Sequence, residues 1–173
     1  MKTSKKAQKQ ERSPDSAHTL DSPIPGLKHR CFGCAPENRT GLHLRFRENP
    51  DALSVESEFR MPRRFEGPPG HLHGGIIATV LDEAMGKVNR RKGVVALTRR
   101  ISVDYLLPVP LATRLRVVGW SVKVEGRKHF HAAEIRTLTG EVLARGEGLF
   151  VAVDPGQMFR KYRQRLTLEG RKK

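Results

Sequence analysis

The feature that most limits the possible folds is a single long helical segment among many short alternating ones. From Gly75 to Arg90, apolar residues recur with the period of an α-helix. One broad face carries Ile76, Ile77, Val80, Leu81, Ala84 and Val88, and the opposite face carries Ala78, Asp82, Gly86 and Asn89. We expect the apolar face to lie on a sheet and the face of small residues to allow a ligand or a second subunit to approach closely.

Six segments alternate apolar and polar residues, as strands do. They span residues 43–48, 52–59, 94–107, 113–125, 127–138 and 141–153, with turn residues between them. The first two indicate a hairpin, and the last four predict an antiparallel meander. One helix on one antiparallel sheet is an α+β arrangement. Because one helix cannot cover both faces of the sheet, the pattern also favours a homo-oligomer.

The composition divides the chain into a globular part at 27–155 and two basic tails at 1–26 and 156–173. The first tail is rich in Lys, Ser and Pro and has no periodicity, so we expect it to be disordered. It lacks the apolar core of a secretory signal. No apolar run approaches the ~20 residues that span a membrane. We therefore expect a cytoplasmic protein without a membrane anchor.

The net charge of +15 indicates an anionic partner. Phosphate-bearing small molecules and nucleic acids both fit this expectation. The tail at 156–173 holds seven Lys or Arg and one Glu, but its only aromatic residues are Phe159 and Tyr162. RNA binding through this tail therefore stays an alternative without a recognisable motif.

The two cysteines, Cys31 and Cys34, form a C-x-x-C motif between His29 and His43. A zinc site or a redox pair is conceivable. The spacing H-x-C-x-x-C-x8-H is unusual for zinc, so the favoured interpretation is reduced thiols that pack a turn. No metal and no cofactor are expected.

The helical segment starts after His73 with two glycines where a capping Ser, Thr, Asp or Asn is usual. Gly74 and Gly75 offer no capping side chain, so we expect free amides that a ligand can approach at the positive end of the helix dipole. Of the two acids in the segment, Glu83 stands four residues before Lys87, which predicts a solvent-facing ion pair. Asp82 is therefore the reactive candidate.

Three stretches together resemble the hotdog-fold acyl-CoA thioesterases of the PaaI-like group: HLHGGIIATVLDEAM with TRRISVDYLLPVPL, CFGCAPENRTGLHLRF, and GRKHFHAAEIRTLTGEVLARGEGLFV. The resemblance covers about residues 30–153. It implies a hotdog fold, in which an antiparallel sheet wraps around one long central helix. It also implies a homodimer or homotetramer, with active sites at the dimer interface that take the helix start from one subunit and the acid from the other.

Carried onto this sequence, the resemblance gives each site residue a role. The Gly74 amide would polarise the thioester carbonyl, and His73 would order the turn or form a nearby hydrogen bond. Asp82 would act as general base or nucleophile, and Thr98 would help to hold water. Strict alternation places Thr98 on the face opposite Leu97 and Ile101.

One position departs from the pattern, because Gly67 stands where many hotdog thioesterases carry Asn or Gln six residues before the His.

The phosphates of coenzyme A would require basic residues around the site. Candidates are Arg127, Lys128 and Arg99, together with Arg100, Arg90 and Arg91. The predicted function is hydrolysis of acyl-CoA thioesters; the alternatives are a non-catalytic acyl-CoA-binding protein and a basic RNA- or partner-binding protein.

Overall fold

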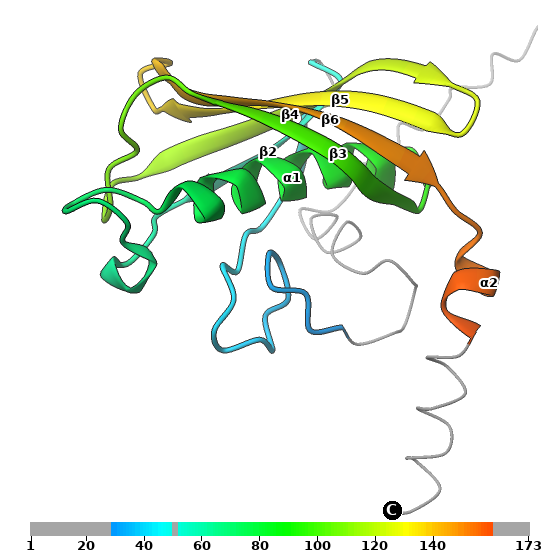
Figure 1. Ribbon diagram of the computed structural model, residues 1–173, viewed down its shortest axis with the longest axis horizontal. Coiled ribbons are helices and arrows are strands. Elements are labelled where there is room, and N and C mark those ends of the chain that lie inside the picture. Colours follow the sequence, from blue (N-terminus) through cyan, green and yellow to red (C-terminus); the bar gives the residue numbers. More distant parts are fainter. Residues whose placement is uncertain (1–28, 50–51, 161–173) are drawn as a thin grey trace, which may run out of the picture.

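The computed structural model describes residues 29–49 and 52–160, in which six strands form one antiparallel sheet with a long helix across one face (Figure 1). The chain order is β1 (Arg47–Asn49), β2 (Ser54–Phe59), η2 (Arg63–Phe65), α1 (Gly74–Arg91), β3 (Ala96–Tyr105), β4 (Leu115–Glu125), β5 (Lys128–Thr137), β6 (Val142–Ala152) and α2 (Pro155–Met158). The predicted α+β architecture with one central helix is confirmed.

The sheet order is β1-β2-β4-β5-β6-β3, which corrects the predicted four-strand meander. Strands β4, β5 and β6 do form a meander, but β3 pairs with β6, from Ala96 opposite Ala152 to Tyr105 opposite Ala144. The long connection after β3 allows this, because a nine-residue link at 106–114 can carry the chain across the sheet to β4. Strand β3 is consequently an edge strand.

The predicted hairpin at 43–48 and 52–59 is present, with Arg47 opposite Glu56, although β1 is only three residues long. The alternating residues before it, Leu42, Leu44 and Phe46, are buried without pairing as a strand. The alternation therefore reflects burial of every second side chain in the core. An extended segment can bury its side chains in this way without pairing to a neighbouring strand.

The core lies between α1 and the inner face of the sheet. The helix buries Ile77, Val80, Leu81, Ala84, Met85 and Val88 there. Met85 extends the predicted apolar face and is fully buried. Gly119 on β4 permits this close packing, because a Cβ at that position would stand 2.8 Å from the carbonyl oxygen of Ala84. The helix backbone thus rests almost directly on the middle of the sheet.

The tail at 1–26, which the sequence predicts to be disordered, lies wholly outside the described residues, and the tail at 156–173 lies outside them from residue 161 onward; residues 50–51 are also outside. Within the described part, the chain after β6 forms the short helix α2, in which Asp154 caps the amides of Gly156 and Gln157. None of the helices in residues 29–49 and 52–160 combines the length and the hydrophobicity needed to cross a bilayer.

Substitution of Gly119 by Ala should lower the free energy of unfolding by about 1–3 kcal/mol, the usual cost of overpacking, because backbone atoms of α1 must move. Chemical denaturation monitored by circular dichroism measures this. Gly86→Ala in α1 is the matched control, since no atom lies within 4 Å of a Cβ there and helix propensity favours Ala. Equal stability of the two variants would contradict the close approach.

Candidate active site

Asp82 lies halfway along α1 and accepts a hydrogen bond from the Thr98 hydroxyl, with 2.8 Å between Thr98 Oγ1 and Asp82 Oδ1. Burial raises the pKa of Asp82 above its ordinary value, the hydrogen bond from Thr98 opposes that rise, and the nearby charge of Glu83 adds to it. The hydrogen bond therefore orients the carboxyl group, and the raised pKa brings its titration closer to neutral pH. That is the setting expected of a general base.

Thr98 reaches Asp82 because β3 has a register shift between Thr98 and Arg100. Thr98 stands opposite Phe150, whose side chain is buried, and Ile101 stands opposite Gly148, which packs against Met85. Both residues thus face α1, so the prediction that Thr98 and Ile101 lie on opposite faces is wrong. The extra residue in a bulge moves each later side chain of the strand to the face opposite the one that strict alternation predicts.

A cavity of about 440 Å³ opens beside this pair. Its wall combines the acid and hydroxyl with Leu97, Phe150 and Arg90. Another part of the wall comes from the turn that contains Cys31 and Cys34, which sequence reasoning treated separately from the acid. The sequence pattern could not reveal this, because the turn and α1 are about 50 residues apart in the chain and meet only in the folded structure.

The start of α1 differs from the expected pair of uncapped amides. His73 is the N-cap residue, and its Nδ1 accepts the Gly75 N–H at 3.0 Å. His73 therefore orders the turn, and the Gly75 amide is already engaged. No residue in the described ranges accepts the N–H of Gly74, so this amide is the donor that remains for a ligand.

A second hollow, of about 390 Å³, lies at this helix start. Tyr105 at the end of β3 donates a hydrogen bond from its hydroxyl to the Gly74 carbonyl at 3.1 Å. Sequence reasoning did not single out Tyr105. The rest of the lining is mostly apolar, with Leu72, Ile77, Leu106, Leu107, Pro108 and Val109.

Gly67 packs directly against the residue that caps the helix. A Cβ at Gly67 would stand 2.8 Å from the Cα of His73, and the two chain segments are also tied by a hydrogen bond from the His73 amide to the Phe65 carbonyl. This arrangement leaves no room for an Asn or Gln side chain at position 67. The contact with His73 thus gives a steric reason for the glycine at position 67, where the family pattern has Asn or Gln.

The charged pair predicted to face solvent is instead enclosed. Lys87 is only 4% exposed, and its ammonium lies 3.5 Å from Glu83 Oε1 and 3.2 Å from Cys34 Sγ. The turn that contains the two cysteines covers this side of the helix, which helical periodicity could not reveal. Asn89, which the sequence places on the face of small residues, is also buried, and its Oδ1 lies 2.8 Å from Nε2 of His131.

The six basic candidates do not gather in one place. Arg90 lines the Asp82 cavity. Arg127 donates to the carbonyl of Ala152, the residue opposite Ala96 of the cavity wall, and Lys128 begins β5 beside it. Arg99 is exposed at the register shift of β3.

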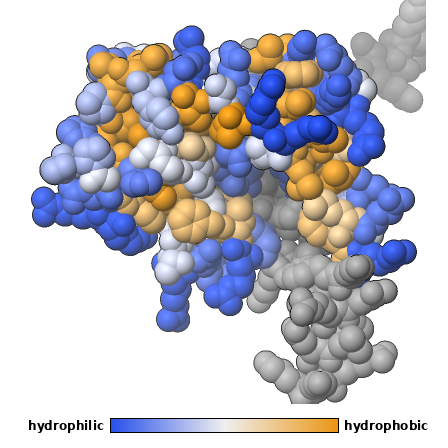
Figure 2. Space-filling view, viewed as in Figure 1, coloured by the Kyte–Doolittle hydropathy of each residue, from blue (hydrophilic) through white to orange (hydrophobic). Residues whose placement is uncertain are grey.

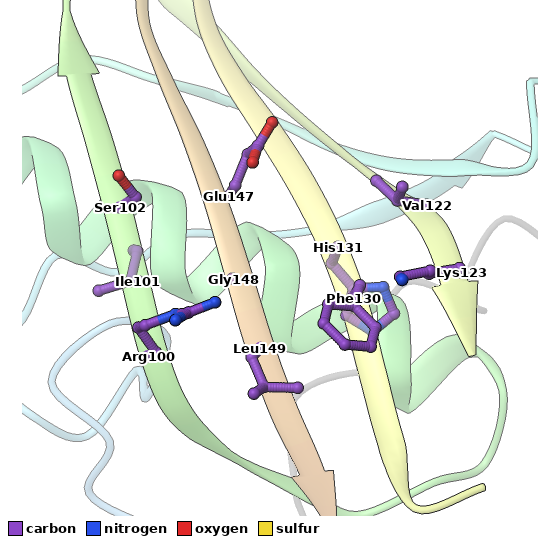
Figure 3. A pocket seen from close by; sticks show the side chains of 10 residues that line it. All are labelled: Arg100, Ile101, Ser102, Val122, Lys123, Phe130, His131, Glu147, Gly148 and Leu149. Atoms are coloured by element: carbon purple, nitrogen blue, oxygen red, sulfur yellow. The ribbon is translucent and has the colours of Figure 1, made fainter. Parts of the chain in front are cut away.

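Arg100 lies away from the acid, on the face of the sheet opposite α1. It lines a hollow of about 580 Å³. Figure 3 shows it there with Leu149, Phe130 and Lys123. Arg91 lies 3.5 Å from Glu48. Of the six basic candidates, only Arg90 lines the cavity beside Asp82.

Comparison with known proteins places these observations in a family. Residues 69–144 match the model of the thioesterase superfamily. The acyl-coenzyme A thioesterase THEM4 of Bos taurus is 30% identical over 120 residues, which cover 69% of this chain and 49% of that protein. The Xenopus laevis THEM4 is 38% identical over 93 residues, covering 52% and 41%. The chain spans about half the length of these relatives.

Among solved structures, a thioesterase superfamily protein is 37% identical and superposes with a TM-score of 0.65, covering 68% of this chain and 60% of that one. A Bacillus halodurans protein solved with CoA is 28% identical with a TM-score of 0.58, covering 65% and 76%. The one-helix, one-sheet architecture shared with these structures is the hotdog fold. Residues 69–144 therefore match the thioesterase superfamily, and the fold of the chain is similar to that of its members.

Substitution of Asp82 by Asn should stabilise the folded protein at neutral pH. The folded-state pKa of Asp82 lies above its unfolded value, so its stabilising contribution is complete below the unfolded pKa and is lost as the pH rises through the folded pKa. Asn retains an acceptor for Thr98 without this loss. The difference in melting temperature between variant and wild type should therefore grow from acid to neutral pH, and a constant difference would contradict the raised pKa.

Proposed function

We propose that this protein hydrolyses the thioester bond of an acyl-coenzyme A, giving a carboxylic acid and free CoA. The observation that carries the proposal is the Thr98–Asp82 hydrogen bond in the wall of a cavity at the sheet edge. The printed names of the THEM4 relatives, and the CoA bound to the Bacillus halodurans protein, support the same substrate class.

Asp82 supplies the base or the nucleophile. As a base, it takes a proton from a water molecule that Thr98 helps to hold, and that water attacks the thioester carbon. As a nucleophile, its carboxylate attacks the same carbon and water then hydrolyses the resulting anhydride. Both routes need the ionised carboxylate and release CoA as the thiol.

The Gly74 amide stabilises the negative charge that develops on the thioester oxygen. It stands at the positive end of the α1 dipole and has no acceptor among the described residues. His73 holds this turn in place through the Gly75 amide. The apolar hollow around Ile77 and Leu107 accommodates the acyl chain next to it.

Asp82 and Gly74 of one chain cannot act on the same carbonyl. They are eight residues apart on one helix, which corresponds to about 12 Å along its axis. Each lies at one end of β3, since Thr98 is near the start of the strand and Tyr105 is its last residue. One chain therefore holds two halves of a site, one at each end of an edge strand.

Pairing β3 with its copy in a second subunit joins these halves. Among the described residues no strand pairs with the outer edge of β3, so this edge offers unpaired backbone groups, which natural proteins usually cover. Exposed large hydrophobic side chains lie along and after it, with Leu97 42%, Tyr105 55% and Leu106 53% exposed. Figure 2 shows hydrophobic surface among hydrophilic side chains on this view of the molecule. Antiparallel pairing about a two-fold axis sets the Asp82 half of each subunit against the Gly74 half of the other.

The phosphates of CoA would contact basic residues at the Asp82 end of the sheet. Arg90 lines that cavity, and Arg127 and Lys128 lie two strands away from its β3 wall. Arg99 is a further candidate on the exposed bulge. Coenzyme A thereby spans from this positive region to the helix start of the partner.

Gly67 favours one alternative, an acyl-CoA-binding protein without turnover. An amide side chain at this position would help to orient water or the acid, and the contact with His73 leaves no space for one. A wild-type protein that binds acyl-CoA but releases no thiol from any of a broad panel of acyl-CoAs would support this alternative.

Asp82→Asn should lower kcat/KM for acyl-CoA hydrolysis by more than about 100-fold, because the variant has neither a base nor a nucleophile. Binding of a non-hydrolysable acyl-CoA analogue should change little. Thiol release and calorimetry measure the two effects. Asp104→Asn, an exposed acid on the same β3 strand, is the matched control. Turnover that survives in Asp82→Asn would exclude the mechanism.

The composite site predicts complementation between two inactive variants. Gly74→Pro removes the proposed N–H while Pro suits the first helical position, and the extended backbone of His73 tolerates a following Pro. Mixing Gly74→Pro with Asp82→Asn by co-expression should restore about a quarter of wild-type activity, from the one intact site in each mixed dimer. Activity that stays at the level of the separate variants would contradict a site shared between subunits.

A further inference from the structure

We propose that His29, Cys31 and Cys34 bind one divalent transition-metal ion, with zinc the expected species, in the wall of the Asp82 cavity. One ligand atom from each of these residues lies within 4.8 Å of the other two. Three such ligands at about 2.0–2.3 Å from a tetrahedral ion lie roughly 3.5–3.8 Å apart. Small side-chain rotations bring the present arrangement to that separation.

The backbone around the two cysteines is already organised as a tight turn. The Ala35 amide donates to the Cys31 carbonyl at 3.1 Å, and the Leu42 and Leu44 amides donate to Phe32 and Gly33 at 2.8 and 2.9 Å. A side chain at Gly33 would collide with the Glu83 carboxylate, so the turn lies directly against α1. Preorganised ligands lose little conformational entropy on binding an ion.

The charges around the cluster fit a dithiolate with a divalent ion. The buried ammonium of Lys87 lies 3.2 Å from Cys34 Sγ, and Cys31 Sγ lies 3.6 Å from Glu83 Oε2. Two thiolates and Glu83 carry three negative charges, which a divalent cation and Lys87 balance. Soft thiolate ligands with one imidazole select zinc over magnesium or calcium.

The structure changes which histidine belongs to the cluster. His43, which the sequence spacing offered as a ligand, instead places its Nε2 2.6 Å from the Asn38 carbonyl oxygen. His29 Nδ1 accepts the Cys31 amide at 3.3 Å and so lies on the cysteine turn itself. The cavity adjoins all three proposed ligands, so solvent completes the coordination.

The ion would fasten the segment before β1 to the middle of α1. This segment supplies the buried residues Leu42, Leu44 and Phe46, and its turn forms part of the wall of the cavity that Thr98 also lines. The proposed site is therefore structural. It takes no part in the hydrolysis steps proposed above.

Cobalt binding tests the site directly. The full chain is reduced, freed of metal with a chelator and titrated with Co²⁺, whose thiolate ligands give a charge-transfer absorption band. We expect one Co²⁺ per chain, displacement by Zn²⁺ and a higher melting temperature with Zn²⁺. Cys31→Ser and His29→Ala should each weaken Zn²⁺ binding by more than about 100-fold, beyond the cost of losing an outer-sphere partner.

His43→Ala is the matched control and should bind Zn²⁺ as the wild type does. Circular dichroism establishes that each variant is folded, and the partly exposed Cys31 is replaced rather than the buried Cys34 for that reason. A folded wild type without the charge-transfer band, or a Cys31→Ser variant that binds Co²⁺ with wild-type affinity, would overturn the proposal. Equal loss in His43→Ala and His29→Ala would do the same. These readouts are independent of acyl-CoA hydrolysis, so they stand whether or not the protein turns over thioesters.

Discussion

The close contact between α1 and the centre of the sheet is the constraint on which the other features depend. Gly119 allows the helix backbone to approach β4, and the apolar face of α1 fills the remaining space with Leu81 and Met85. With the helix seated at this depth, its middle turn is level with the start of β3. Asp82 can then meet Thr98 at hydrogen-bond distance, and burial follows for the carboxyl group.

The edge position of β3 has equal importance for function. A strand inside the sheet would have both its edges occupied, whereas in the described part of the chain β3 pairs with β6 alone. Its two ends carry Thr98 beside the acid and Tyr105 beside the helix start, so the two halves of the site lie at opposite ends of the strand. A partner related by a two-fold axis places the Tyr105 end of its β3 beside the Thr98 end of this one. The two chains together then form two complete sites.

The turn with Cys31 and Cys34 explains why a lysine is buried in the middle of an otherwise ordinary helix. Lys87 would cost several kcal/mol to bury without anionic partners. The Glu83 carboxylate supplies the anionic partner, and the Cys34 sulfur accepts a hydrogen bond from the ammonium. The same turn supplies part of the wall of the Asp82 cavity. The N-terminal segment, the helix and the candidate active site are therefore mechanically connected, so a ligand held by the turn would influence the shape of the site.

Residue pattern alone determined the elements: one amphipathic helix, six alternating segments, and Asp82 on the small-residue face, because these follow from the 3.6- and 2-residue periods. Tertiary structure decided where those elements meet. The pairing of β3 with β6 and the cover over Glu83 and Lys87 depend on contacts between distant residues, which periodicity does not encode. The bulge that turns Thr98 toward Asp82 changes the parity of a strand, and the imidazole of His73 caps a helix that looked uncapped. The family resemblance added the roles of Gly74 and Asp82 and their division between two subunits. The three-dimensional arrangement added that these residues lie at opposite ends of an edge strand, because strand order depends on contacts between distant residues.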